Sequence, residues 1–469
     1  MLLLSLLLGL LSLASPLSAS PLSTPHPTLP AALSYAPSLS LLVSPSPHLY
    51  APAPFSLHPH PVPAAAFASL LSDAHLFPRL CRLACSPGGY ASFLRPALRG
   101  AAAADPGFTG RLLSLADSLP PPPHPPLLLA RGDYMFAAAG PKQIELNTIA
   151  SSFGCLASRV SELHALLAPS LPLPANGALP LLAAALALAA ASFSPAPPRS
   201  PLPRAVLFVV QPGESNSPDQ HLLELALRAR GVRALRRTLA QLSELPPEGG
   251  DAVLSDGGGA PHVVAVVYYR AGYSPRDYPG EREWRARGAL ERGSAVKCPD
   301  VRGQLFGCKK VQQVLATERL GELVGDEGLR RRLGGYMAGL WALGRGDGDA
   351  VAMALENPGG FVMKPQREGG GNNLYGGEMR DALLAMGEGE REAFVLMELV
   401  KPEASPCVLV RDGEVRHDGP GVCEVGVFAA SLGEEEVEGE GFLVRVKAEG
   451  TEEGGVAAGY AFLSSPLPV

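Results

Sequence analysis

The chain has 469 residues, of which 46% are hydrophobic and 18% are charged, and this length suggests two or three domains. Glycine (52 residues) and proline (48 residues) together exceed a fifth of the chain, but no Gly-X-Y period is present, which excludes a collagen-like fibre. The formal net charge of −6 argues against a general nucleic-acid binder. Of the 39 basic residues only seven are lysine, so arginine carries most of the positive charge.

The first 72 residues contain no Asp, Glu, Lys or Arg. The apolar run at 2–14 is too short to cross a bilayer of ~30 Å as a helix. It resembles the hydrophobic region of a signal peptide without the basic residues that precede one, and a transit peptide would be rich in arginine. Residues 15–63 are rich in Ser and Pro and are typical of flexible chain. We therefore expect residues 1–50 to lie outside the fold. We favour the cytosol as the compartment, and plastid and secretory targeting stay open.

The seven cysteines are scattered and contain no C-x-x-C pair. This spacing supports neither a disulfide scaffold nor a zinc site, and it predicts reduced thiols.

Hydrophobic periodicity predicts the elements in chain order. Before residue 204 it predicts helices at 64–84, 109–118, 156–167 and 181–191, with proline-rich breaks at 120–126 and 195–203. The next hundred residues predict a compact α/β unit, 204–305, with strands at 205–211, 233–238 and 263–270 and helices at 220–230 and 281–292. Helices are then expected at 309–323, 327–343 and 349–356.

From residue 360 onward strands dominate, and an Asp-Gly turn at 412–413 joins two of them. The fold class predicted by the whole pattern is α/β to α+β, with a mostly antiparallel C-terminal sheet.

A glycine-rich segment, 364–378, has the features of a phosphate-binding loop. A predicted strand leads into three consecutive glycines, whose backbone N–H groups can approach a phosphate closely. Lys364 supplies a compact positive charge and Glu368 an oxygen ligand for Mg²⁺. The alternative is a flexible surface hairpin. The segment is not a Walker A loop, because G-x-x-x-x-G-K-[ST] is absent.

A second segment, 142–159, begins with a predicted strand. Period-two alternation places Glu145 and Asn147 on one face, where a carboxylate and an amide oxygen could share one Mg²⁺. The alternative is an exposed strand face. Just upstream, Arg131 could hold a carboxylate through two hydrogen bonds.

Two further segments carry unusual basic residues. Lys309 and Lys310 stand at the predicted start of a helix, where cations are unfavourable unless an anion is also present. Arg445 and Lys447 share one face of a predicted strand. The motifs G-x-S-x-G and H-E-x-x-H are absent and no histidine cluster exists, which argues against serine-hydrolase and zinc-hydrolase chemistry.

Together these segments resemble eukaryotic glutathione synthetases of the ATP-grasp superfamily, from about residue 50 to the C-terminus. The resemblance is carried by RGDYMF, KQIELNTIASSFG, CEVGVF, GGVAAG and, most specifically, KPQREGGGNNLYGGEM. It implies an ATP-grasp catalytic domain formed by 51–203 and 306–469, with 204–305 as an inserted α/β substrate-binding domain.

The implied reaction joins γ-L-glutamyl-L-cysteine to glycine, with ATP cleaved to ADP and phosphate through an acyl phosphate. The implied cofactors are ATP and two Mg²⁺ per site, and the implied assembly is a homodimer with no nucleic-acid or membrane partner.

The matching positions imply roles for individual residues. The resemblance implies Arg131, Arg445 and Lys364 as catalytic groups and Glu145, Asn147 and Glu368 as Mg²⁺ ligands. It implies that ATP binds Glu145, Lys309, Lys364, Glu368, Gly369, Gly370, Gly371, Asn372, Asn373, Tyr375, Met397, Glu398, Leu399, Val400, Glu424, Lys447 and Glu453. It implies that the other substrates bind Arg131, Ala150, Ser151, Ser152, Phe153, Glu214, Asn216, Gln220, Arg270, Tyr273, Arg445, Val456 and Ala457.

Departures from the family pattern leave alternatives open. Val446 replaces the usual Thr, but alternation sends it to the opposite face from Arg445 and Lys447. The acidic stretch 433–441 is short for the family and is interpreted as a solvated hairpin. A ligase that uses β-alanine, or a nucleotide-binding pseudoenzyme, are the competing hypotheses. The small residues of the GGVAAG segment favour glycine.

Overall fold

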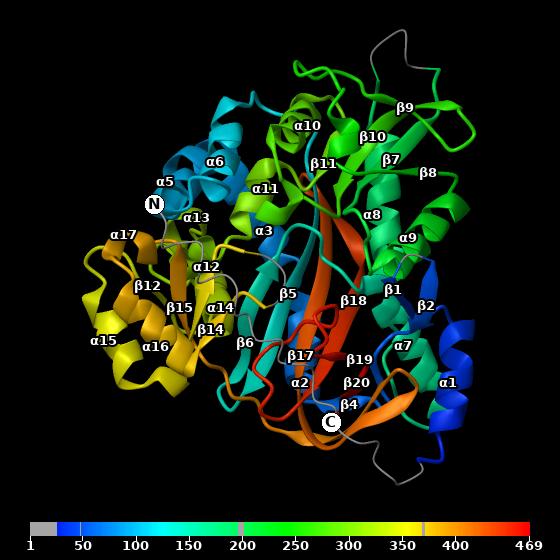
Figure 1. The fold of residues 1–469 in the computed structure, drawn as a ribbon, viewed down its shortest axis with the longest axis vertical. Coiled ribbons are helices and arrows are strands. Elements are labelled where there is room, and N and C mark those ends of the chain that lie inside the picture. Colours follow the sequence, from blue (N-terminus) through cyan, green and yellow to red (C-terminus); the bar gives the residue numbers. More distant parts are fainter. Residues whose placement is uncertain (1–25, 47, 196–200, 368–370) are drawn as a thin grey trace, which may run out of the picture.

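In the computed structural model, residues 26–46, 48–195, 201–367 and 371–469 are described. The chain forms mixed α/β layers around a seven-stranded sheet whose strand order is β16-β3-β19-β18-β17-β5-β6, with an additional β16–β17 pairing (Figure 1). Its neighbours are antiparallel except for β19 and β3, which are parallel. The strands are β3 (Phe55–Ser56), β5 (Leu127–Ala137), β6 (Gly140–Asn147), β16 (Ser405–Arg411), β17 (Glu414–Leu432), β18 (Glu435–Ala448) and β19 (Phe462–Ser464).

One face of this sheet packs on N-terminal helices. Tyr134, Val425 and Val444 point into the same core cluster as Phe67 and Leu80, so alternate residues of the strands are free to build a polar face on the other side. The helical segments of this region are α2 (Ala64–Asp73), α3 (Leu76–Cys85), α4 (Pro87–Gly89), η1 (Tyr90–Leu94), α5 (Arg95–Ala104) and α6 (Thr109–Ser118). The predicted helices at 64–84 and 109–118 are confirmed, the first as two helices.

A second layer of helices covers the opposite face of the sheet, at the part that carries Leu129 of β5 and Phe428 of β17. α7 (Gly154–Leu167) and α8 (Ala178–Ser192) bury apolar residues against Leu129 and Phe428 of the sheet. The run at 181–191 is thus a buried helix, as predicted. Among the described residues, no helix combines the length and apolar character that crossing a bilayer requires.

The unit at 204–305 contains four parallel strands in the order β11-β10-β7-β8. The fifth strand, β9, pairs with β10 in the antiparallel direction. The predicted strand–helix–strand pattern is confirmed, and α10 has the predicted bounds. The elements are β7 (Arg204–Val209), α9 (Ser217–Ala229), β8 (Arg233–Arg237), η2 (Ala240–Leu242), β9 (Val253–Ser255), β10 (Pro261–Tyr269), η3 (Pro275–Asp277), α10 (Glu281–Arg292) and β11 (Val296–Cys298).

A smaller four-stranded antiparallel sheet, β12-β15-β13-β14, lies beside the large sheet with α15, α16 and α17 (Figure 1). The predicted helix at 327–343 is wrong in its last part, because α14 ends at Tyr336 and 340–342 pair with β15. The elements from 301 are α11 (Val301–Phe306), α12 (Lys309–Leu315), α13 (Leu320–Leu323), α14 (Glu327–Tyr336), β12 (Leu340–Ala342), α15 (Gly348–Glu356), η4 (Pro358–Gly360), β13 (Phe361–Pro365), β14 (Leu374–Tyr375), α16 (Gly376–Ala385), α17 (Glu388–Arg391) and β15 (Phe394–Glu398).

The C-terminal hairpins follow the predicted pattern. Asp412 and Gly413 both have positive φ, as a tight turn between β16 and β17 requires. The acidic hairpin between β17 and β18 is exposed at 434–436, which confirms the solvated interpretation.

The expectation that residues 1–50 lie outside the fold is wrong for the described part of that stretch. Helix α1 (Leu29–Ser38) buries Ala32 and Ala36 completely, and Leu41 is equally buried. Strands β1 (Leu42–Ser46) and β2 (Leu49–Pro52) pair with each other, and β4 (His60–Val62) pairs with β20 (Pro466–Pro468). Residues 1–25 lie outside the described residues.

Two buried histidines, His60 and His164, are expected to make the stability of the fold depend on pH. His164 contacts the hydroxyl of Ser465 and the carbonyl of Ser56, and burial lowers the pKa of His164 and of His60 to about 4. The folded protein keeps both rings neutral, whereas the unfolded chain binds protons below the ordinary pKa of about 6.5. Folding is therefore weakened as the pH falls from 6.5 toward 4.

Between pH 7 and pH 5 we expect the free energy of unfolding to fall by about 2 kcal/mol for each histidine. Urea denaturation at both pH values measures the change. The variant His164→Gln should show a smaller pH dependence, and a free energy of unfolding that is constant between pH 7 and pH 5 would contradict the prediction.

Candidate active site

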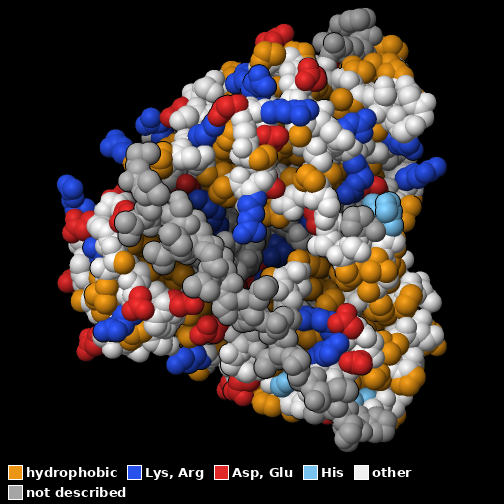
Figure 2. Space-filling model, in the orientation of Figure 1, with side chains coloured by type: hydrophobic (Ala, Val, Ile, Leu, Met, Phe, Trp, Pro, Cys, Tyr) orange, Lys and Arg blue, Asp and Glu red, His pale blue; other side chains and the backbone are white. Residues whose placement is uncertain are grey.

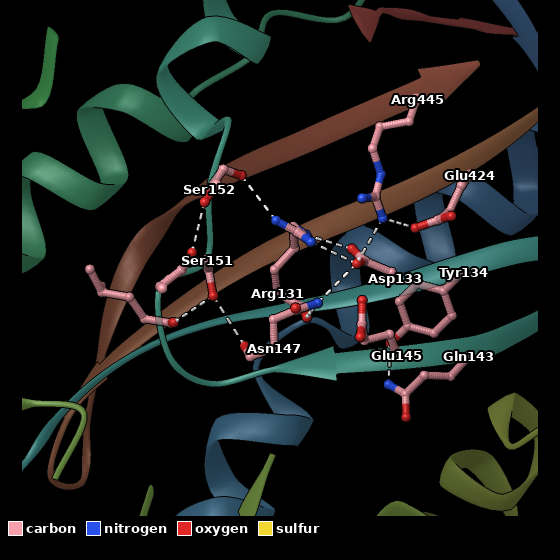
Figure 3. Close-up of polar contacts among 12 residues, drawn as sticks. Arg131, Asp133, Tyr134, Gln143, Glu145, Asn147, Ser151, Ser152, Glu424 and Arg445 are labelled. Carbon is pink, nitrogen blue, oxygen red and sulfur yellow. Dashed lines mark hydrogen bonds and ion pairs between the residues drawn. The ribbon is translucent and has the colours of Figure 1, made fainter. Parts of the chain in front are cut away.

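Four neighbouring strands place polar residues on one face of the large sheet. The registers pair Asn147 of β6 with Arg131 of β5, and Glu145 with Asp133. Across the next strands, Gly426 of β17 lies opposite Asp133, and Glu424 lies opposite Arg445 of β18. Because side chains alternate along a strand, these residues share one face, as Figure 3 shows.

Two arginines meet at the buried carboxylate of Asp133. The Arg131 guanidinium donates from Nε and Nη2 to the two carboxylate oxygens, at 2.6 and 2.7 Å. Arg445 Nη2 donates to Asp133 Oδ2 at 3.0 Å and also pairs with Glu424 (Figure 3). Within the described residues Arg445 Nε is buried without a hydrogen-bond acceptor. This buried N–H is a donor that a bound anion could use.

A cavity of about 480 Å³ opens beside this face and separates the large sheet from the small one. Figure 2, in the orientation of Figure 1, shows Lys and Arg side chains at a hollow near the centre of the molecule. Of the predicted nucleotide-binding residues, the following line it: Glu145, Lys309, Lys364, Asn372, Asn373, Tyr375, Met397, Glu398, Leu399, Val400, Glu424, Lys447 and Glu453. Arg445 lines it as well, and predicted Glu368, Gly369 and Gly370 lie outside the described residues.

Lysines cluster around Glu145 in the cavity. Lys309 Nζ lies 2.7 Å from Glu145 Oε1, and Lys364 Nζ donates to the carbonyl of Ile144 at 3.0 Å. Burial opposes ionisation of Glu145, but Lys309 and Lys364 lower its pKa. Burial also lowers the pKa of Lys364 and of Lys447 to about 8. These clustered ammonium groups are suited to a polyanion such as a triphosphate.

Two segments that line the cavity, 372–375 and 449–455, contact each other. The backbone N–H of Gly371 donates to Glu453 at 3.1 Å, and the hydroxyl of Tyr375 donates to the carbonyl of Glu452. Lys447 Nζ donates to the same carbonyl at 2.7 Å. Residues 371–375 therefore meet the segment 449–455 beside the cavity.

The predicted substrate residues fall into two groups. Arg131 donates to the carbonyl of Ser152, and Arg270 donates to the carbonyl of Ser151 and to the Ser152 hydroxyl, so the loop 148–153 is held between them. Ala150 and Phe153 of this loop have left-handed backbone conformations.

The second group stands at the start of α9. Glu214 accepts from the Asn216 N–H and from the Gln220 side chain. Among the described residues both polar side-chain atoms of buried Asn216, and Nε of Arg270, lack partners. Orphaned buried donors and acceptors of this kind indicate a place for a polar ligand. Tyr273, Val456 and Ala457 are not joined to either group by a side-chain hydrogen bond.

Sequence reasoning missed three carboxylates that hold this site. Asp133 is described above. Asp219 accepts from the backbone N–H groups of Phe153, Cys155 and Leu156 and so fixes the start of α7. Asp277 accepts from three successive N–H groups, 272–274, which fixes the turn that carries Tyr273. Alternation from Arg131 could have placed Asp133 on the same face, whereas the other two have no local signal.

The sequence model for "Eukaryotic glutathione synthase, ATP binding domain" matches residues 31–467, which places the chain among ATP-binding enzymes. A chloroplastic glutathione synthetase of Solanum lycopersicum is 39% identical over 448 residues, which cover 88% of this chain and 77% of the relative. The glutathione synthetase of Homo sapiens is 38% identical over 448 residues, covering 89% and 90%. The chain belongs to the eukaryotic glutathione synthase family.

A solved structure shares the fold. A glutathione synthetase-like effector from Globodera pallida superimposes with a TM-score of 0.69 over 94% of this chain and 96% of that one, at 19% sequence identity.

ATP binding is expected to weaken at alkaline pH. Lys447 lines the cavity with a pKa of about 8, so it loses its charge above that pH, and a bound triphosphate would favour the protonated form. Lys364 lines the same cavity with a pKa that is also about 8, so we expect the Kd for ATP to rise at least about tenfold between pH 7 and pH 9, with proton uptake on binding near pH 8.

Calorimetric titration in buffers of different ionisation enthalpy measures both effects. The variant Lys447→Arg keeps its charge and should show a smaller rise in Kd. A Kd that is the same at pH 7 and pH 9 would refute the prediction.

Proposed function

We propose that the chain catalyses the ATP-dependent ligation of γ-glutamylcysteine and glycine to glutathione through an acyl phosphate. ATP-dependent glutathione synthesis is supported by family membership and by the curated relatives. The observation that carries the chemical step is the sheet face on which Arg131, Arg445 and Glu145 adjoin a cavity lined by lysines. The relatives do not favour the β-alanine alternative.

The proposed fold is ATP-grasp, in which a nucleotide lies between two antiparallel sheets. Its support is the position of the cavity, whose lining includes Val362 and Met397 of the small sheet and Val422 of the large one. We assign 51–203 and 306–469 to the catalytic domain and 204–305 to an inserted substrate-binding domain.

The reaction needs neutralisation of the phosphate charge and exclusion of water, and it needs no protein nucleophile. A carboxylate oxygen of the dipeptide attacks the γ-phosphorus of ATP, the bond to the ADP oxygen breaks, and an acyl phosphate forms. The amine of glycine then attacks the acyl carbon, and phosphate leaves with that oxygen. Lys309, Lys364 and Lys447 would bind the phosphate oxygens, and Arg131 and Arg445 the transferred group and the tetrahedral oxyanion. The two contacting loops would exclude water from the acyl phosphate.

The residues present fit a magnesium site in part. Asn147 Nδ2 donates to Asp133, so the amide oxygen is its atom for a cation, and Glu145 adds a carboxylate on the same face. The described residues contain no cluster of three metal-binding side chains, and the proposed third ligand, Glu368, lies outside them. When bound, Mg²⁺ supplies charge neutralisation at the phosphates; we propose two ions per site.

The dipeptide is assigned to the groups that bridge the two domains. Arg270 and Asn216 offer the orphaned polar atoms noted above, and the loop 148–153, Glu214 and Gln220 complete that surface. Tyr273, Val456 and Ala457 are proposed as further contacts for the amino-acid substrates.

The proposed assembly is a homodimer with small-molecule substrates. The cytosol is the proposed compartment. Buried Cys155, Cys298 and Cys423 are free thiols, as a reducing compartment favours.

An assay of ADP release tests the function. We expect turnover with γ-glutamylcysteine and glycine, and at least tenfold lower kcat/KM when β-alanine replaces glycine. Preference for β-alanine would assign the other ligase activity, and ATP binding without turnover on either amine would refute the proposed function.

A further inference from the structure

Asp133 lies at the junction of the arginines, with its side chain completely buried. Oδ1 accepts from Arg131 Nε at 2.6 Å. Oδ2 accepts from Arg131 Nη2 at 2.7 Å, from Arg445 Nη2 at 3.0 Å and from Asn147 Nδ2 at 2.9 Å. Figure 3 shows the carboxylate between the two guanidinium groups.

This arrangement addresses a problem of charge. Two guanidinium groups that converge on one small anion repel each other, most strongly in a buried site where the effective dielectric constant is low. A carboxylate between them offsets the repulsion, and the bidentate pairing with Arg131 also fixes the plane of that guanidinium. Arg445 then keeps its buried Nε–H without a partner among the described residues.

The neighbouring strand leaves room for this junction. Gly426 is the cross-strand partner of Asp133 in β17. A Cβ at Gly426 would lie 2.6 Å from Asp133 Oδ1 and 2.8 Å from Arg131 Cδ, closer than real Cβ contacts allow. The absence of a side chain at this position is therefore a condition for the ion pair.

We propose that Asp133 is a positioning residue for phosphoryl transfer. Its carboxylate binds Arg131 and Arg445 and so orients both guanidinium groups toward the reacting carboxylate of the substrate. The proposal rests on the proposed ligase function. Asp133 itself touches neither substrate nor ATP and acts through the two arginines. Its contact with Asn147 offers a rival explanation, in which it acts through the metal site, and the experiment separates the two.

The first test is steady-state kinetics of Asp133→Asn, which keeps the shape and removes the charge. We expect kcat to fall about 10²-fold while KM for ATP stays within about twofold, because Lys309, Lys364 and Lys447 are untouched. The Mg²⁺ concentration for half-maximal rate should also stay within about twofold.

Asp73→Asn is the matched control. Asp73 is also a buried carboxylate, and both of its oxygens accept hydrogen bonds from Arg332. It accepts a further hydrogen bond from the Tyr336 hydroxyl and lies outside the site. Its replacement should lower the melting temperature without changing kcat of the folded enzyme. A purely structural role for Asp133 would give this same result.

A double-mutant cycle with Arg445→Gln tests the route of action. If Asp133 acts through Arg445, the double variant should be no more than about threefold slower than the slower single variant. Multiplicative losses both in this cycle and in the same cycle with Arg131→Gln would overturn the proposal, as would a normal kcat in Asp133→Asn or a loss that excess Mg²⁺ restores.

Should Asp133→Asn fail to fold, Gly426→Ala decides, because it displaces the ion pair and removes no charge. At least a tenfold fall in kcat with unchanged KM for ATP supports the proposal, and an unchanged kcat overturns it. Absence of turnover in the unaltered enzyme would instead refute the ligase function on which the proposal rests.

Discussion

Replacement of Arg445 by alanine is expected to lower kcat by about 10²–10³-fold while ATP still binds. The side chain is buried between Asp133 and Glu424, and its Nε–H has no acceptor among the described residues. A preorganised donor of this kind acts where negative charge develops, and losing one typically costs about 10²–10³-fold in rate. Turnover measured by ADP release, with ATP affinity measured separately, checks the expectation.

The control for this variant is Arg416→Ala. Arg416 belongs to the same sheet and pairs with Asp412 and Glu414 at the surface, so its loss should leave turnover unchanged. If Arg445→Ala retained kcat within fivefold of the unaltered enzyme, Arg445 would have no place at the reacting groups.

Replacement of Glu145 by glutamine is expected to lower kcat by at least about 10²-fold and to raise the Mg²⁺ requirement. Glu145 is the carboxylate of the predicted metal pair, and neutralisation of phosphate charge contributes several kcal/mol to the transition state. Its charge also holds Lys309, 2.7 Å away. The measurement is the rate as a function of Mg²⁺ concentration.

Glu162→Gln is the comparison variant for Glu145. It removes a glutamate that pairs with Arg159 at the surface of α7, and it should leave the Mg²⁺ dependence unaltered. A Glu145→Gln enzyme with normal kcat and normal Mg²⁺ dependence would remove Glu145 from the metal site.

Local alternation was sufficient to predict part of the site. It placed Glu145 and Asn147 on one face of a strand and sent Val446 away from Arg445 and Lys447, and the registers confirm both expectations. Such predictions succeed because a strand's period depends on the backbone alone.

The rest of the site depends on contacts between distant segments. The strand order β18-β17-β5-β6 brings Arg445 to Asp133, which are 312 positions apart, and no local pattern specifies that order. Helix α1 was missed for a related reason, because its small apolar residues are ordered by burial against α7 rather than by an amphipathic pattern of their own.

The fate of one oxygen atom tests the central claim most directly. With ¹⁸O in the carboxylate of the cysteinyl residue of γ-glutamylcysteine, activation as an acyl phosphate transfers one labelled oxygen to the inorganic phosphate released in each turnover. Mass spectrometry of that phosphate should therefore show one ¹⁸O per glutathione formed. Unlabelled phosphate accompanying labelled glutathione would contradict the mechanism assigned to this sheet face.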